Sequence, residues 1–285
     1  MQWTTRFVKT MPVSIGIWLL VVMMYLPGCD SGSPNMTVAE QAFYGEQRSK
    51  ENSARDVYRH PKETLGFFGV QPGMTVVEVW PGTGWYSEIL APLLAERGQL
   101  YAAHFSDEAN ANFKLRLLSR YKEKLASADV YDRVILTVLD PPRFTEIAPA
   151  QSADLVLTFR NVHNWMKDNT ELEVFEAFYR ALKPGGILGV VEHRANEPIS
   201  REQMIATGYV SETYTIELAK RAGFTLLARS EINANPSDEK NYPEGVWTLP
   251  PTLRLGEVGQ NRYLIIGESD RMTLKFQKPI TMGAE

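Results

Sequence analysis

The chain has 285 residues, of which 44% are hydrophobic and 22% charged, and its formal net charge is −4 at pH 7. This composition is ordinary for a globular protein, and no repeat or long low-complexity tract interrupts it. A single cysteine excludes a disulfide framework. The acidic balance argues against a nucleic acid partner, because such binding depends largely on Lys and Arg side chains that contact phosphate.

The N-terminus has the pattern of an export signal. Arg6 and Lys9 form a positive region, and residues 11–26 form an apolar run without a charge. This run is shorter than the roughly 20 residues that a spanning helix needs, which favours a cleaved signal peptide. Residues 26–29, Leu-Pro-Gly-Cys, resemble the bacterial lipobox, in which the cysteine becomes the acylated first residue. The alternative is an uncleaved single-span anchor, and either interpretation tethers the domain outside the cytoplasm.

These features divide the chain into a lipoprotein signal peptide (1–28), a polar tether (29–36) and one domain (37–285). Cys29 is the predicted lipidation site, so we expect a lipid anchor in the membrane and no thiol in the mature domain. Asp30 follows it, and the resemblance to enterobacterial lipoproteins implies the periplasmic side of the inner membrane rather than the outer membrane. The mature chain would keep 28 basic and 34 acidic residues, a net charge of −6.

Strands and helices are predicted to alternate through the first part of the domain. Residues 37–63 are polar and predict a helical segment packed on the domain and limited near Pro61. Thr170 and Glu173 fit a capping box at a helix start. The alternation predicts right-handed crossovers and a mostly parallel sheet covered on both faces. The predicted strands are 74–80, 99–105, 133–139, 153–159 and 187–192, and the predicted helices are 85–96, 107–126 and 170–182.

The pattern changes after a further predicted helix at 212–222. Residues 224–232 and 272–276 are strand-like, with no helix clearly demanded between them, and predict an antiparallel pair at the edge of the sheet. Residues 235–255 are rich in proline and polar side chains and form a long insertion loop. Long ordered loops are often functional.

A glycine turn lies between the first strand and the first helix of this alternation. Gly82 and Gly84 let the backbone approach a ligand, and the N-terminus of the following helix offers free N–H groups. A nicotinamide-binding domain fits poorly, because Ser87 and His104 occupy the positions of the third glycine and of the acid that binds ribose.

Three motifs together resemble those of class I S-adenosylmethionine-dependent methyltransferases. Glu78, Gly82 and Gly84 match the first motif, residues 154–157 the motif of the fourth strand, and residues 182–188 the turn into the fifth. Nearly all of the mature chain also resembles a group of exported predicted methyltransferases without an assigned substrate. The resemblance implies an α/β, Rossmann-like, doubly wound and mostly parallel seven-stranded sheet with an antiparallel edge hairpin. It also implies S-adenosylmethionine as cofactor, with contacts from Glu78, Trp80, Gly82, Gly84, His104 and Asp140.

Two of these positions depart from the family pattern. Trp80 stands where the first glycine is expected, and His104 stands where an acid binds both ribose hydroxyls. A neutral imidazole can accept only one hydrogen bond. Asp140 matches the acid that contacts the adenine amino group.

A polar cluster directly follows the predicted fourth strand. Arg160, Asn161, His163 and Trp165 are therefore expected at the carboxyl edge of the sheet, where ligands bind in this architecture. We interpret His163 as a candidate general base, Arg160 as a group that holds an anion and Trp165 as a wall of the pocket. The alternative is that these side chains only fix the loop.

Other residues have two open interpretations. Residues 192–194, Glu-His-Arg, end the fifth strand either as ligand-facing groups or as a salt-bridged strand end. Residues 58–60 either close over the pocket or pack as part of the N-terminal segment, and Trp247 either walls the pocket or covers the sheet edge. His104, His163 and His193 all end strands, which raises a metal site with Glu192. No short ligand spacing supports such a site, and we predict none.

The sequence therefore predicts transfer of a methyl group from S-adenosylmethionine to a small or medium-sized acceptor. Two alternatives stay open. One is a periplasmic binding or scaffold protein that kept the fold and lost methyl transfer. The other is a metal-assisted hydrolase. Fold alone does not choose among them.

Overall fold

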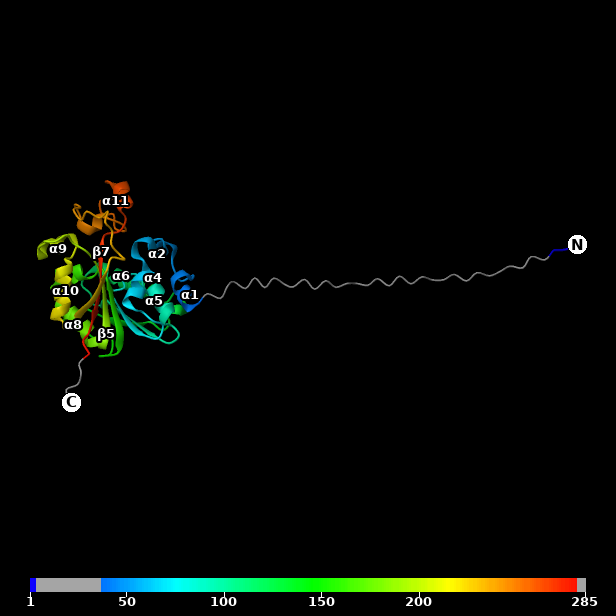
Figure 1. The fold of residues 1–285 in the computed structure, drawn as a ribbon, viewed down its shortest axis with the longest axis horizontal. Coiled ribbons are helices and arrows are strands. Elements are labelled where there is room, and N and C mark those ends of the chain that lie inside the picture. Colours follow the sequence, from blue (N-terminus) through cyan, green and yellow to red (C-terminus); the bar gives the residue numbers. More distant parts are fainter. Residues whose placement is uncertain (4–36, 281–285) are drawn as a thin grey trace, which may run out of the picture. The chain divides into compact units, whose positions relative to one another are not determined.

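Seven strands form one sheet in the order β3-β2-β1-β4-β5-β7-β6 (Figure 1). The computed structural model describes residues 1–3 and 37–280, so the predicted signal peptide beyond residue 3 and the whole tether, including Cys29, lie outside the described residues. Strands β1 to β5 are parallel, and β7 lies antiparallel between β5 and β6. The strands are β1 Thr75–Val79, β2 Gln99–His104, β3 Ile135–Val138, β4 Ala153–Phe159, β5 Leu182–His193, β6 Thr225–Ser230 and β7 Arg271–Gln277.

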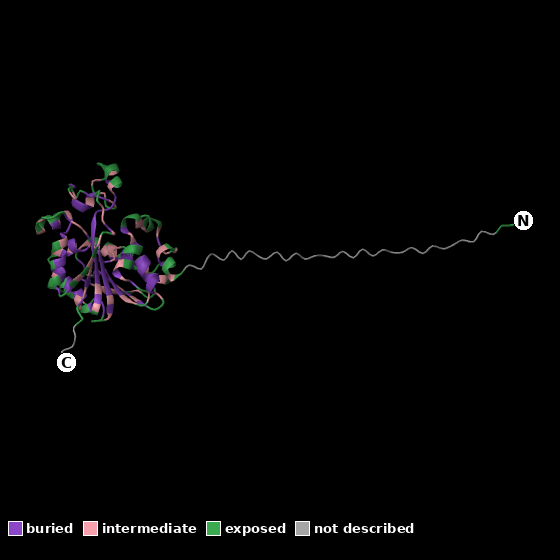
Figure 2. Ribbon diagram, viewed as in Figure 1, coloured by how far each residue is buried: buried purple, intermediate pink, exposed green. Residues whose placement is uncertain are grey.

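Helices cover both faces of the sheet, which gives the domain two apolar cores (Figure 2). One core packs α8 and α10 against the sheet, and the other packs α4 and α5 against the opposite face. The helices are α1 Val38–Tyr44, α2 Lys50–Ser53, α3 Asp56–Arg59, α4 Pro61–Phe68, α5 Ser87–Leu94, α6 Asn112–Leu125, α7 Val162–Asp168, α8 Glu171–Ala181, α9 Arg201–Thr207, α10 Glu212–Arg221 and α11 Gln260–Ile266, with 3₁₀ turns η1 Asp129–Tyr131 and η2 Gly245–Thr248.

The N-terminal segment packs on α5 as four short helices rather than one. Every residue of α5 is buried, and its Glu88 carboxylate is fully buried. Glu88 accepts hydrogen bonds from Asn52 Nδ2 at 2.8 Å and Lys124 Nζ at 2.6 Å, and Arg48 Nε lies 3.4 Å away. The buried acid thus ties the N-terminal segment to both α5 and α6. Pro61 begins α4 at a position where its missing N–H has no helical partner to lose.

The predicted capping box at Thr170 does not form. The side chain of Thr170 makes no cap hydrogen bond, and its backbone N–H instead donates to Trp165 O at 3.0 Å. The reason is the short helix α7, which the sequence did not predict. It ends at Asn169 in the left-handed conformation, and its closing hydrogen bonds place Thr170 outside the extended geometry that a capping residue needs.

The C-terminal part confirms the antiparallel edge hairpin, in which β6 and β7 are joined by a long connection. Strand β7 pairs with both β5 and β6, and residues 231–270 separate β6 from β7. This connection contains η2 and the unexpected helix α11. The sequence also missed α9, although Ser200 and Gln203 form a capping box at its start.

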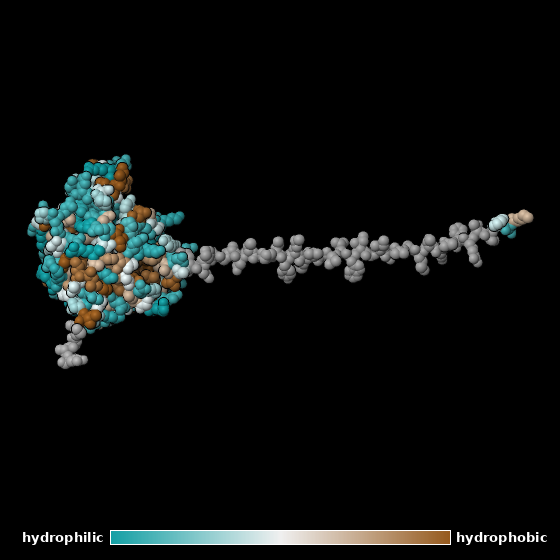
Figure 3. Space-filling model, in the orientation of Figure 1, coloured by the Kyte–Doolittle hydropathy of each residue, from teal (hydrophilic) through white to brown (hydrophobic). Residues whose placement is uncertain are grey.

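Exposed apolar side chains gather at the end of the domain that carries α11 (Figure 3). Val258, Leu264 and Ile265 are the large ones there. Within residues 1–3 and 37–280, no helix is both long and apolar enough to cross a bilayer.

Candidate functional site

The carboxyl ends of β1, β2, β4 and β5 meet at one edge of the sheet. Two residues at this edge have a left-handed backbone although they are not glycine: Trp80 after β1, with φ 46°, and Arg160 after β4, with φ 64°. Such conformations cost roughly 1–3 kcal/mol each and cluster at functional sites. The edge is therefore the candidate ligand site.

The glycine turn after β1 is fastened to the end of β2. Gly82 and Gly84 have φ of 64° and 86°, which glycine adopts without strain. His104 Nε2 lies 2.9 Å from the carbonyl oxygen of Gly82, and the N–H of Phe105 donates to His104 Nδ1 at 2.8 Å. The ring is thus an Nε2–H tautomer with both nitrogens engaged inside the protein. Burial lowers the pKa of His104 to about 4, which keeps the imidazole neutral.

Trp80 packs at the position where the resemblance implied a glycine. Its indole N–H donates to Leu139 O at 3.0 Å, and its ring lies 4.5 Å from the ring of Phe105 and 5.5 Å from that of Trp165. Trp165 is fully buried in the core among aromatic side chains. Trp165 therefore packs against Trp80 from the core side. It does not form the wall of the pocket that the sequence predicted.

A cavity of about 350 Å³ lies beside this turn, and we call it the glycine-turn cavity. Asn161 lines it and also fastens β4 to β1, because its Nδ2 donates to Val79 O at 3.0 Å and to Thr158 Oγ1 at 3.2 Å. Its lining also includes Trp80, Gly82, Phe105, Phe113 and Asn164.

Two acids implied as cofactor contacts lie apart from this cavity. Glu78 is buried, and its Oε2 accepts a hydrogen bond from Ser87 Oγ at 2.6 Å. Burial raises the pKa of Glu78 to about 7, an effect that the Ser87 hydrogen bond partly offsets. Asp140 exchanges backbone hydrogen bonds with Phe144 in the loop after β3 and is not among the residues that line the cavity.

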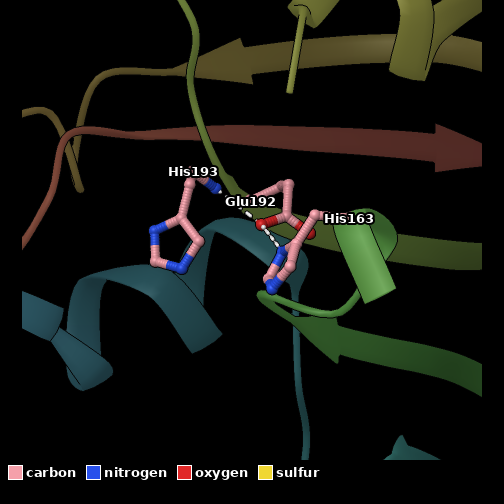
Figure 4. A group of neighbouring side chains, drawn as sticks. All are labelled: His163, Glu192 and His193. Atoms are coloured by element: carbon pink, nitrogen blue, oxygen red, sulfur yellow. Dashed lines mark hydrogen bonds and ion pairs between the residues drawn. The ribbon is translucent and has the colours of Figure 1, made fainter. Parts of the chain in front are cut away.

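A buried carboxylate and a histidine form a pair at the end of β5 (Figure 4). Glu192 Oε1 lies 3.1 Å from His163 Nδ1 and accepts a hydrogen bond from the backbone N–H of His193 at 2.8 Å. Its Oε2 accepts the N–H of Val162, the first residue of α7, at 2.5 Å. A carboxylate can only accept, so His163 carries its proton on Nδ1 and leaves Nε2 as the acceptor nitrogen.

The second histidine of this edge is bound to a serine. His193 Nδ1 lies 2.5 Å from Ser269 Oγ, and the rings of His193 and His163 lie 5.5 Å apart. Burial lowers the pKa of His193 well below its usual range, and the nearby His163, Arg271 and Arg160 lower it further. His193 is therefore neutral near pH 7.

Potential ligand atoms of His163, Glu192 and His193 lie within 4.8 Å of one another. The sequence did not predict this convergence of the three residues, whereas His104 is engaged with the glycine turn and does not join them. Arg194 has the structural role considered for it: its guanidinium binds Asp270 at 3.0 Å and Glu231 at 2.7 Å.

A second cavity, of about 180 Å³, lies in front of these histidines, and we call it the histidine cavity. Trp247 of the insertion loop forms one wall, with its ring 5.9 Å from that of His163. Arg160 lines this cavity while its neighbour Asn161 lines the other. Its polar and aromatic lining includes Arg160, His163, His193, Trp247, Glu268, Ser269 and Arg271.

Sequence reasoning missed Glu268, Ser269 and Arg271 in this cavity. They lie immediately before and at the start of β7, which is antiparallel to β5. The amino end of an antiparallel strand reaches the edge where the parallel strands end. The sequence predicts that residues 272–276 form an antiparallel strand. That prediction could have placed the residues just before this strand at the site.

Comparison with solved structures relates the fold to known enzymes. A SAM-dependent methyltransferase from Aquifex aeolicus matches with a TM-score of 0.52 and 17% identity over 79% of this chain and 93% of its own. A putative sarcosine dimethylglycine methyltransferase from Galdieria sulphuraria matches with a TM-score of 0.53 and 13% identity over 82% and 88%. The [4+2]-cyclase SpnF matches with a TM-score of 0.56 and 17% identity over 82% and 85%.

These neighbours and the strand order define the α/β, Rossmann-like fold of S-adenosylmethionine-dependent methyltransferases. No family model and no curated protein matches the sequence. The same fold also carries a protein named as a cyclase, so the activity has to be argued from the site.

Proposed function

We propose that this protein is an exported, membrane-anchored methyltransferase that uses S-adenosylmethionine to modify a small or medium-sized acceptor. The observation that carries the proposal is the pair Glu192–His163 at the carboxyl edge of a methyltransferase fold, next to a ligand-sized cavity at the glycine turn. Export and anchoring rest on the signal pattern of residues 1–28 and on Cys29.

The glycine-turn cavity fits the cofactor in size and in its aromatic walls. Its volume of about 350 Å³ falls inside the range of about 300–1,000 Å³ that is usual for ligand pockets. Trp80, Phe105 and Phe113 offer faces for a flat base, and Asn164 offers an amide to the ribose hydroxyls in place of the family's acid. When bound there, S-adenosylmethionine supplies an electrophilic methyl group that passes to an acceptor lone pair as the carbon–sulfur bond breaks.

The histidine cavity would then orient the acceptor. His163 Nε2 is the atom that takes the acceptor's proton, because Nδ1 is held by Glu192. The carboxylate fixes the tautomer of the ring and stabilises the imidazolium that forms. Trp247 would limit the access of water from the side of the insertion loop.

A titration of the folded chain with S-adenosylmethionine and S-adenosylhomocysteine tests the proposal. We expect micromolar binding that Asn164→Ala weakens about fivefold to tenfold, which corresponds to one hydrogen bond of about 1 kcal/mol. Asn241→Ala, an exposed amide outside both cavities, serves as the matched control. Absence of binding at millimolar ligand, with native circular dichroism, would exclude methyl transfer from this donor.

A binding protein that lost methyl transfer is the second candidate. His104 has both ring nitrogens engaged, and Glu78 lies against Ser87, so neither offers the family contact to the cofactor. This candidate predicts that a ligand of the histidine cavity binds while S-adenosylmethionine does not.

The third candidate, a metal-assisted hydrolase, has the proximity of His163, Glu192 and His193 in its favour. Two observations weigh against it. Glu192 already accepts three N–H groups, and the arginine side chains Arg160 and Arg271 line the same cavity and repel a cation.

A further inference from the structure

Four arginines surround one carboxylate, Glu268, which lines the histidine cavity. Glu268 Oε1 accepts from Arg55 Nε at 2.6 Å, and Glu268 Oε2 lies 3.2 Å from Arg59 Nε and also pairs with Arg271 Nη2. Arg160 is the fourth, and no side-chain hydrogen bond or ion pair of its guanidinium occurs within residues 37–280. One acid thus faces four cations, which leaves an excess of positive charge.

Several donors of this cluster have no partner. Arg59 and Arg271 are only 3% and 2% exposed, yet Arg59 Nη1 and Arg271 Nε make no hydrogen bond to any described residue. Buried donors of native proteins nearly always have a partner, and a charged one is costly to leave without one. Arg271 lines the cavity, and its orphan Nε indicates that an acceptor is missing from the site.

The positive charges of the arginines shift the pKa values of their neighbours in the cluster. Burial, together with the positive charge of Arg271, lowers the pKa of Arg160 to about 10. Burial also lowers the pKa of Arg59 well below its usual range, with Arg160 as the next cause. Although burial by itself raises it, the pKa of Glu268 is held at about 2 by Arg271, Arg59 and Arg160. An added negative charge would relieve this repulsion.

The remaining wall of the cavity suits a small anion with a polar head. His193 is neutral, and Ser269 adds a hydroxyl. A volume of about 180 Å³ equals the space of about six water molecules at about 30 Å³ each. Guanidinium groups recognise carboxylate and phosphate through paired hydrogen bonds, because their planar fork matches both.

We propose that the histidine cavity binds a small carboxylate-bearing or phosphate-bearing molecule, with Arg160 as its main ligand and Arg271 completing the positive field. The binding of the anion stands on the arginine cluster alone. Its further assignment as the methyl acceptor rests on the proposed function, and it would place the anionic group at Arg160 and the reacting atom within reach of His163 Nε2.

Calorimetric titration of the full chain at constant ionic strength tests the site with inorganic phosphate and with succinate. Succinamide serves as the neutral analogue of succinate. We expect at least one anion to bind with a submillimolar dissociation constant and succinamide not to bind. Binding of phosphate but not of succinate would identify the ligand as phosphate-bearing. Binding of succinate but not of phosphate would identify it as carboxylate-bearing. Absence of binding by both anions, or equal binding of succinamide, overturns the proposal.

Variants of Arg160 locate the site. Arg160→Gln should weaken anion binding at least tenfold, whereas Arg221→Gln, an exposed arginine on α10, should leave it unchanged. Arg160→Gly is the second variant, because glycine adopts the φ of 64° without strain and keeps the fold if glutamine does not. Unchanged affinity in Arg160→Gly would also overturn the proposal. No methyl donor enters this experiment, so its failure is separate from a failure to bind S-adenosylmethionine.

Discussion

Arg271, the first residue of β7, pairs in register with His193, the last residue of β5. This antiparallel pairing brings the segment before β7, with Glu268 and Ser269, to the edge where the parallel strands end. Arg271 and His193 therefore meet at one cavity, although residues 194–270 separate them in the sequence.

Removal of the single acid in the arginine cluster should destabilise the fold. Glu268→Gln leaves four guanidinium groups without a counter-charge, and breaking a buried pair from one side costs about 3–5 kcal/mol. Urea denaturation would measure this loss of unfolding free energy. The control is Glu217→Gln, which breaks the exposed ion pair between Glu217 and Lys220 and should change the unfolding free energy by less than about 1 kcal/mol. A loss as small as that of the control would contradict the description of Glu268 as the centre of the cluster.

The tautomer of His163 can be read by nitrogen NMR. Because Glu192 accepts from Nδ1, the neutral ring should carry its proton on Nδ1 and show an unprotonated Nε2. Glu192→Leu, which cannot accept a hydrogen bond, should remove this preference and shift the ring toward the Nε2–H form. A ring that is already in the Nε2–H form in the unaltered protein would rule out His163 Nε2 as the proton acceptor.

His104 should make the stability depend on pH in acid. Burial lowers its folded pKa from 6.5 to about 4, so the folded form resists a proton that the unfolded chain binds. This contribution is fully present above pH 6.5 and is lost as pH falls through 4. At about 1.4 kcal/mol per pKa unit, the loss reaches about 3 kcal/mol. We expect the unfolding free energy of the wild type minus that of His104→Gln to fall by this amount between pH 7 and 4.

The same pH titration on a reference variant separates His104 from other groups. His60→Gln, at the start of α4, keeps His104 in place. If the difference between wild type and His104→Gln stays flat between pH 7 and 4, the buried neutral ring is not the source of the acid sensitivity.

The insertion loop is fastened over the histidine cavity by a buried tyrosine. Tyr209 Oη lies 3.0 Å from both carboxylate oxygens of Asp238. Tyr209→Phe should cost about 2 kcal/mol, because the buried carboxylate of Asp238 loses a hydrogen-bond donor. In Tyr209→Phe, the backbone amides of residues 235–255 should exchange their hydrogens faster than in the wild type. The control variant Tyr44→Phe, which changes an exposed tyrosine, should exchange these amides at the wild-type rate. Unchanged protection of the loop would mean that other contacts hold it.

The predicted lipid anchor can be tested by intact mass. Wild-type protein from the membrane fraction should lack residues 1–28 and carry lipid on Cys29, whereas Cys29→Ser should keep its full length. Ser31→Ala is the control and should be processed like the wild type. Equal, full-length masses for wild type and Cys29→Ser would instead support the uncleaved anchor.

The sequence by itself determined the fold. Period-2 and apolar runs placed five parallel strands, and the motifs at Glu78, residues 154–157 and residues 182–188 placed them in a methyltransferase-like order. This worked because strand and turn signals are local, and because alternating strands and helices allow few topologies. The direction of the two edge strands also followed from the missing helix between them.

Only the tertiary structure decided which side chains face a ligand. Trp165 lies in the core, although His163 of the same helix lines the histidine cavity. Asn161 lines the glycine-turn cavity, although its neighbour Arg160 lines the histidine cavity. A one-residue step around the short helix α7 turns a side chain from cavity to core, and the sequence did not predict that helix. The partnering of Glu192 with His163, and of Glu268 with four arginines, depends on strand pairing between distant segments, which local patterns do not encode.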